Sequence, residues 1–77
     1  MIDLAAVRRE AGLTQVQLAA NLGVGQAHVS KVERQSDMLL STLASYLSGL
    51  DAESRLIVEV AGHTMTFDLE TGRGPRR

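Results

Sequence analysis

The sequence contains no cysteine and no tryptophan, and only one proline, one phenylalanine and one tyrosine. Without cysteine, neither a disulfide framework nor a zinc site with thiolate ligands can hold the chain together. The chain also lacks an apolar run of about 18 residues, the length that a membrane-spanning helix needs. Its first residues are acidic and apolar, without the basic region of a signal peptide. We therefore expect a cytoplasmic protein that uses no metal and no cofactor.

The composition allows a single small domain. Hydrophobic residues make up 44% of the 77 residues, but the two aromatic residues enlarge the core only slightly. Domains of this size often gain stability by oligomerisation, so a partner subunit is expected. The sequence has no glycine-rich phosphate loop, no glycine-flanked nucleophile, and two histidines in unlike contexts. We do not expect an enzyme.

The net charge of −1 argues mildly against nucleic-acid binding, because strong phosphate binders usually carry a basic excess. The distribution of charge is more informative than the sum. Between residues 8 and 34 the basic side chains are Arg8, Arg9, Lys31 and Arg34. The acids in that segment are Glu10 and Glu33. The C-terminal part is more acidic before a basic tail at residues 73–77, with Asp51, Glu53, Glu59, Asp68 and Glu70.

The periodicity predicts four helices in the first 50 residues. The first spans 3–11, with Asp3 as N-cap and Gly12 after its end; the second begins after Thr14 and ends near Gly23. The third spans about 26–34, and two short helices joined by a glycine turn are typical of a helix-turn-helix. The fourth begins between residues 38 and 41, capped by Asp37 or Ser41, and ends at Gly49. Inward-facing positions are predicted at Val16, Leu18, Ala19, Ala20, Leu22, Val29, Val32, Leu39, Leu43, Tyr46, Leu47 and Leu50.

After Asp51 the apolar period changes from 3.6 to 2, which predicts a β-hairpin. A two-residue turn at Gly62-His63 would place Ala61 opposite Thr64 and Val60 opposite Met65, so that apolar residues face one another. The apolar face consists of Leu56, Val58, Val60, Met65, Phe67 and Leu69. Because an isolated hairpin is marginal in water, we expect this face to pack on the fourth helix and the outer strand to pair with a second subunit.

The segment Leu13 to Arg34 resembles the lambda-repressor-like helix-turn-helix family, the Xre group of bacterial and phage regulators. The resemblance covers roughly residues 3–50. It rests on Thr-Gln at 14–15, Leu-Ala at 18–19, Leu-Gly-Val at 22–24, and on Val29, Val32 and Glu33. After Glu33 the sequence departs from the family pattern, because Arg34-Gln-Ser-Asp-Met-Leu-Leu-Ser has no glycine or proline, and the conformation of the 34–40 loop is left open.

The resemblance implies a major-groove recognition helix whose DNA-binding residues are Gln15, Gln26, Ala27, His28, Lys31 and Arg34. Gln26 suits adenine, Lys31 suits guanine or a phosphate, and Gln15 suits a phosphate. The resemblance also implies a structural salt bridge between Arg8 and Glu33. The simpler alternatives are a helical hairpin without a DNA role, solvated Lys31 and Arg34, and an exposed bystander at His28.

A short chain with a helix-turn-helix and a strand-forming tail also resembles the antitoxin of a type II toxin–antitoxin pair. The sequence of residues 37–47 is similar to that subgroup as well. This resemblance implies neutralisation of a partner toxin and repression of the chain's own operon. The alternatives are a stand-alone Xre-type regulator, and a protein-interaction module that keeps the scaffold without binding DNA.

The sequence thus predicts a mainly α fold: a four- to five-helix, lambda-repressor-like domain over residues 1–52, then a dimerisation hairpin over 53–70 and a disordered basic tail over 71–77. We expect a homodimer on a pseudo-palindromic operator, with recognition helices about 34 Å apart. The expected location is the bacterial cytoplasm, and the nucleoid when DNA is bound.

Overall fold

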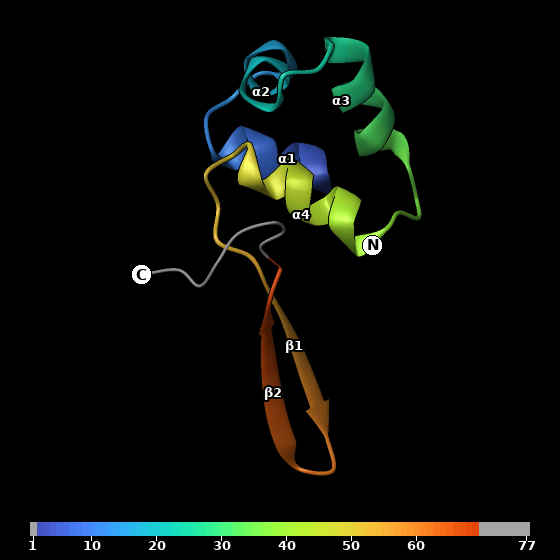
Figure 1. The fold of residues 1–77 in the computed structure, drawn as a ribbon, viewed down its shortest axis with the longest axis vertical. Helices are drawn as coiled ribbons and strands as arrows, with labels where there is room; N and C mark the ends of the chain where they lie inside the picture. The colour runs from blue at the N-terminus through green and yellow to red at the C-terminus, as the bar shows by residue number, and fades with distance from the viewer. Residues whose placement is uncertain (1, 70–77) are drawn as a thin grey trace.

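The computed structural model describes residues 2–69, in which four helices are followed by a two-stranded antiparallel sheet (Figure 1). The helices are α1 (Leu4–Glu10), α2 (Gln15–Leu22), α3 (Gln26–Arg34) and α4 (Leu40–Ser48), and the strands are β1 (Arg55–Val60) and β2 (His63–Asp68). This order confirms the predicted fold class. The basic tail predicted for residues 71–77 lies outside the described residues.

The first two helices begin at the caps that the sequence predicts. The Asp3 side chain accepts a hydrogen bond from the backbone N–H of Ala6 at 3.1 Å. Thr14 and Gln17 form a capping box, in which each side chain accepts from the other residue's backbone N–H. Gly23 ends α2 with a φ of 72°, a left-handed conformation that glycine adopts without a steric penalty. Local sequence chemistry therefore sets these boundaries.

The core lies between the four helices, and Leu18 and Val29 are its fully buried large side chains. Leu4, Ala19, Val32, Tyr46 and Leu50 complete the buried cluster. Two inward positions predicted on α2 are wrong, because Val16 is 59% exposed and Ala20 is exposed. The short helix buries one narrow stripe through Leu18, and residues two positions away along a helix point to nearly opposite sides.

The start of α4 also differs from the prediction. Its N-cap is Leu39, not Asp37 or Ser41, and no side chain caps the helix. Leu39 is 72% exposed, so its predicted inward position is wrong as well. Tertiary packing of α4 through Ala44 and Tyr46 decides where this helix begins, without help from a local cap.

Gly49 is placed where α4 ends against α2. The Asn21 side chain donates to the Gly49 carbonyl at 2.9 Å. A Cβ atom at Gly49 would lie 2.6 Å from Leu22 Cδ2 and 2.7 Å from Leu18 Cδ1. The absence of a side chain thus allows the close approach of the two helices at this point.

We expect Gly49→Ala to lower the free energy of unfolding by about 1–3 kcal/mol, because the added methyl group overpacks the core. Chemical denaturation monitored by circular dichroism measures this difference. Ser45→Ala, on the exposed side of the same helix, should change stability by less than about 0.5 kcal/mol. Equal stability of the Gly49→Ala variant and the parent would contradict the close approach.

The hairpin extends away from the helices as a separate arm (Figure 1), and every residue of both strands is exposed. The predicted packing of its apolar face on α4 is therefore wrong within one chain. That face keeps Leu56, Val58, Val60, Met65 and Phe67 at between 37% and 54% exposure. No helix among residues 2–69 is long and apolar enough to cross a membrane.

The predicted hairpin register is wrong by two residues. The turn consists of Ala61 and Gly62, with φ values of 52° and 80°, which matches a type I′ turn. Val60 therefore pairs with His63, Val58 with Met65 and Leu56 with Phe67. Because side chains alternate with a period of two, this shift keeps the apolar residues of both strands on one face.

Candidate nucleic-acid interface

Helix α3 turns its polar side chains away from the core. Val29 and Val32 are buried, whereas Gln26, Ala27, His28, Lys31 and Arg34 are exposed. With 100° between successive residues, Ala27, Lys31 and Arg34 lie near the middle of the exposed face, and Gln26 and His28 lie on opposite flanks. The five predicted contact residues of α3 therefore share one accessible surface, with Gln26 at one edge of it and His28 at the other.

The predicted pair Arg8–Glu33 is present and joins α1 to α3. Arg8 Nε lies 2.7 Å from Glu33 Oε2, and its Nη2 donates to Oε1 at 3.4 Å. The third guanidinium nitrogen donates to the carbonyl of Leu13 at 2.9 Å. Both side chains are nearly buried, with exposed fractions of 10% and 6%. Arg8 thus supplies no free positive charge for a phosphate; it fixes α3 against α1.

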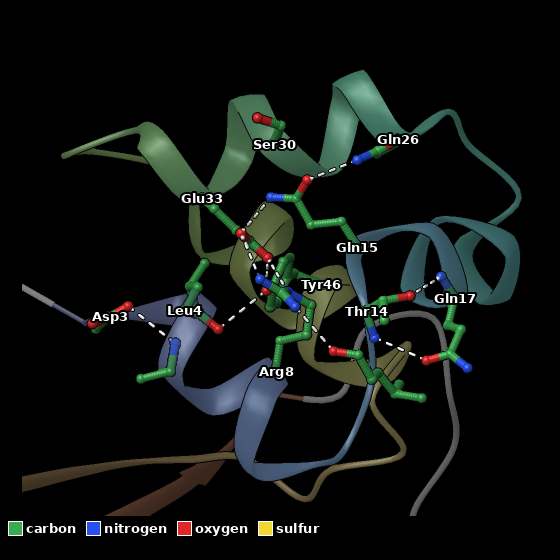
Figure 2. A network of polar contacts seen from close by, with 12 residues as sticks. Asp3, Leu4, Arg8, Thr14, Gln15, Gln17, Gln26, Ser30, Glu33 and Tyr46 are labelled. Carbon is green, nitrogen blue, oxygen red and sulfur yellow. Dashed lines mark hydrogen bonds and ion pairs between the residues drawn. The ribbon is translucent and has the colours of Figure 1, made fainter.

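Tyr46 of α4 joins the same cluster, and Figure 2 shows its hydroxyl group beside the carboxylate of Glu33. The hydroxyl oxygen lies 2.6 Å from Glu33 Oε2 and 3.1 Å from the carbonyl oxygen of Leu4. The sequence identified Tyr46 only as a core residue. A buried tyrosine hydroxyl needs a polar partner, which is the signal that would have placed it in this cluster.

Gln15 and Gln26 continue the network from Glu33 to the exposed surface (Figure 2). The Gln15 amide nitrogen donates to Glu33 Oε1 at 2.9 Å, and the Gln26 amide nitrogen donates to Gln15 Oε1 at 3.2 Å. An ionised carboxylate only accepts, so it fixes the direction of both amides. Gln26 keeps one N–H and its amide oxygen free of these bonds. It can therefore present one donor and one acceptor to a ligand.

The surroundings of Glu33 keep it ionised. Burial alone would raise the pKa of this carboxyl group, but hydrogen bonds from Arg8, Tyr46 and Gln15 outweigh that effect and lower the pKa below its ordinary value. The hydrogen bond to Glu33 is the main reason that the pKa of Arg8 is raised. Burial, together with the bond to Glu33, raises the pKa of Tyr46 well above its ordinary value. At neutral pH the cluster holds one cation, one anion and a neutral phenol.

The lowered pKa of Glu33 predicts a loss of stability in acid. Its contribution is complete above the ordinary pKa of 4.5 and declines as the pH falls from there through the folded-state pKa. Denaturant titrations at several pH values below 5 should therefore show a falling free energy of unfolding. The matched Glu33→Gln variant should show a shallower fall over that range. Identical slopes for the two proteins would contradict the assignment.

Arg34 and His28, two further predicted contact residues, lie apart from the network around Glu33. Arg34 Nη1 donates to the hydroxyl oxygen of Ser30, which lays the guanidinium along the exposed face of α3. His28 borders a hollow of about 290 Å³ between α3 and α4, whose other walls include Val32 and Tyr46. The structure therefore brings Gln15 and Gln26 into direct contact, and it sets His28 apart from them.

The segment after α3 is where the sequence departs from the family pattern. The helix ends at Arg34, and Gln35 continues in an extended conformation with φ of −72° and ψ of 137°. None of residues 35–39 has a positive φ, so the chain connects α3 to α4 without a left-handed residue.

This arrangement of helices defines the class of protein: residues 4–47 match the model of the helix-turn-helix family, and the chain belongs to that family. Among curated proteins it is similar to antitoxin HigA1 from two strains of Mycobacterium tuberculosis, with 47% identity over 58 residues. The match covers 74% of this chain but 39% of the relative, so the chain spans about two fifths of the length of these proteins.

Two solved structures have a similar fold over nearly their whole length. A structure described as DNA-bound antitoxin HigA3 superposes with a TM-score of 0.77 at 34% identity, covering 87% of this chain and 90% of that one. A second, from work on DNA bending by a unique dimerisation of the HigA antitoxin, gives 0.76 at 34% identity and covers 87% and 93%. Because 87% of the chain exceeds the matched family segment, the likeness extends beyond the four helices.

Proposed function

We propose that this protein is a sequence-specific DNA-binding repressor, and that it acts as an antitoxin that represses its own operon. The observation that carries the proposal is the hydrogen-bonded chain from buried Glu33 through Gln15 to exposed Gln26. A helical hairpin without a ligand needs no such ordered amide on its surface. The likeness to a DNA-bound HigA antitoxin at 34% identity supports the same conclusion.

In the proposed complex, α3 lies in the major groove and Gln26 reads adenine. Adenine offers an acceptor at N7 and a donor at N6, which match the free N–H and the amide oxygen of Gln26. Guanine offers two acceptors there, and the fixed oxygen of Gln26 would oppose one of them. Lys31 and Arg34 lie on the same exposed face and suit guanine or phosphate oxygens. Ala27 permits close approach to a thymine methyl group, and His28 at the flank suits the backbone.

Gln15 stands in the first turn of α2, where the backbone N–H groups of a helix attract a phosphate. In this role the Gln15 amide would bind Gln26 and a phosphate at the same time. Gln15 would then both orient the base-contacting side chain of Gln26 and hold α2 against the DNA backbone. The basic side chains on this surface are few, and one copy should bind weakly. We therefore propose a homodimer on a pseudo-palindromic operator.

We assign dimerisation to residues 53–70 and DNA binding to residues 1–52. The face of the hairpin formed by Leu56, Val58, Val60, Met65 and Phe67 is exposed in one chain, and Leu69 is half-buried at its base. An apolar face of this kind on a two-stranded arm needs a partner for stability. The dimer acts in the bacterial cytoplasm, where operator DNA lies.

The antitoxin role is proposed from the HigA1 and HigA3 likenesses and from the acidic hairpin region, which suits a basic toxin. The alternative is a regulator without a toxin. Co-expression with the neighbouring reading frame distinguishes them: a toxin partner should be lethal alone and harmless with this protein. Harmlessness of that neighbour when expressed alone would favour the stand-alone regulator.

DNA binding is tested by fluorescence anisotropy with the DNA upstream of the gene and with a random duplex. Affinity for both should fall steeply as salt rises, because phosphate contacts release counterions. The upstream DNA should bind more tightly at every salt concentration. Absence of binding to both duplexes at low salt would overturn the proposal in favour of a protein-interaction module.

We expect Gln26→Ala to weaken operator binding by about 1–3 kcal/mol and to remove the preference for adenine at one position of each half-site. Lys31→Ala is the contrasting variant: it should weaken binding to all sequences and reduce the salt dependence. Anisotropy titrations with the operator and with single-base variants measure both effects. An operator affinity insensitive to Gln26→Ala would reject the assignment of the adenine reader.

A further inference from the structure

The polar face of the hairpin carries one large apolar side chain that its own strands do not explain. On this face β1 presents Arg55, Ile57 and Glu59 in turn, all exposed. Ile57 is 60% exposed and pairs across the hairpin with Thr66, a polar residue. This isoleucine lies between a cation and an anion in the middle of an edge strand, whose unpaired backbone groups can pair with another strand.

The backbone groups of the same three residues point away from β2. The N–H of Leu69 donates to the carbonyl of Ser54 at 3.2 Å, and the register of the strands continues to place these two residues opposite one another, so they are a hydrogen-bonded pair of the ladder. Hydrogen-bonded and non-hydrogen-bonded pairs alternate along an antiparallel ladder. The even-numbered residues of β1 therefore bond to β2. The N–H and C=O groups of Arg55, Ile57 and Glu59 line the free edge.

The free edge of β1 is complementary to itself. If a second copy pairs antiparallel with it about a two-fold axis at Ile57, Ile57 meets the partner's Ile57 and Arg55 meets the partner's Glu59. Every outward N–H and C=O of the three residues then finds a partner in the other chain. On the opposite face, Leu56 lies across from the partner's Val58, so apolar residues also meet at the junction.

The free edge of β2 is less complementary to itself than the free edge of β1. Its outward residues are Thr64, Thr66 and Asp68, because they pair with the outward residues of β1. A two-fold axis at Thr66 would bring Met65 opposite the partner's Phe67 on the apolar face. On the polar face it would place Asp68 opposite a threonine, without opposite charges and without an apolar contact at the axis. Shifting the β1 pairing by two residues would set Arg55 or Glu59 opposite isoleucine instead. One edge and one register thus combine hydrogen bonding, charge complementarity and apolar contact.

We propose that two copies dimerise through β1, antiparallel about an axis at Ile57, to form a four-stranded sheet in the order β2–β1–β1–β2. This inference rests on the proposed homodimeric repressor and specifies its interface. Arg55 also lies 3.1 Å from Glu53 and 3.8 Å from Asp68, but both of those pairs are exposed. Exposed ion pairs are weak, and the five donors of an arginine leave some for the partner's Glu59.

Single-cysteine variants of the full chain test the edge, because the chain has no cysteine of its own. Residues opposite one another in a hydrogen-bonded pair have Cα atoms about 5.5 Å apart, within the range that a disulfide spans. Ile57→Cys should therefore form a covalent dimer under mild oxidation. The matched Thr66→Cys variant, in the middle of the β2 edge, should not. Cross-linking of Thr66→Cys instead of Ile57→Cys would overturn the proposal.

Charge exchange tests the register. Arg55→Glu and Glu59→Arg each place like charges opposite one another twice in the dimer, and each should raise the dimer dissociation constant about tenfold or more. Mixed together, the two variants should form a heterodimer, because the partner of each then carries the opposite charge. Sedimentation of the separate and mixed samples measures this. A mixture no more associated than its components would overturn the register.

The outcomes separate this inference from the proposed function. A wild-type protein that dimerises and binds its operator, but fails both β1 tests, would overturn the β1 interface and leave the repressor intact. A protein that passes both β1 tests and binds no DNA would overturn the repressor and leave the interface intact. Ile57→Cys is read with circular dichroism, since a helical signal equal to that of the parent shows that the helices are folded.

Discussion

Replacing Glu33 by alanine is expected to lower the free energy of unfolding by about 3–5 kcal/mol, because it leaves a buried guanidinium without its anion. Arg8 and Glu33 are 10% and 6% exposed, so water cannot replace the lost carboxylate without opening the core. The same change removes the acceptor of the Tyr46 hydroxyl group at 2.6 Å. Thermal denaturation should show a melting temperature lower by roughly 12 °C or more.

Two further variants test the reason for this loss. Glu10→Ala, which removes an exposed glutamate from α1, should change stability by less than about 0.5 kcal/mol. In a double-mutant cycle, Arg8→Ala combined with Glu33→Ala should cost less than the sum of the single changes, because neither charge is then left alone. Reduced DNA affinity with an unchanged melting temperature would contradict the architectural role of Glu33.

A charge on the apolar face of the hairpin is expected to weaken operator binding strongly while the helices remain folded. Val58→Asp places an acid on β1 beside Leu56 and Val60, where we propose that the second subunit packs. A monomer holds one half-site only, and loss of the second contact should weaken operator binding about 10²-fold to 10⁴-fold. Anisotropy with the operator and light scattering on the same samples measure affinity and mass together.

Thr66→Asp adds the same charge to the polar face of the hairpin and is the matched control. It should leave both the dimer and operator affinity nearly unchanged, because Thr66 is exposed on the edge that we do not assign to dimerisation. Neither variant should change the melting of the helices, from which the hairpin stands apart (Figure 1). Full operator affinity in Val58→Asp would contradict the role of the hairpin in dimerisation.

The predictions that depend on contacts between residues close in sequence are confirmed. Asp3 and Thr14 cap the helices that follow them, and Gly23 adopts the left-handed conformation that ends α2. These features depend on contacts between residues a few positions apart, and on the steric freedom of one glycine. The bounds of α3 also agree with the prediction, since the buried Val29 and Val32 fix its inward side.

Predictions failed where the local pattern of residues fits more than one arrangement of the chain. Gly62 supplies a positive φ in either turn, and both registers keep the apolar residues together. The turn at Ala61-Gly62 requires alanine in the left-handed conformation, which is sterically unfavourable for a residue with a Cβ atom. Likewise Val16 and Leu39 are as apolar as their buried neighbours, but no element within residues 2–69 covers them.

The helix-turn-helix, its caps and the polar face of α3 follow from the amino-acid sequence, because periodicity and capping are properties of short segments. The hydrogen bonds that orient the side chains of that face depend instead on the packing of the helices. Glu33, Tyr46 and Gln15 lie on three different helices, and their hydrogen bonds depend on how those helices pack. Packing also left the hairpin apart from α4, with an edge and an apolar face exposed. A single chain cannot bury both, and this is the physical reason that we assign them to a second subunit.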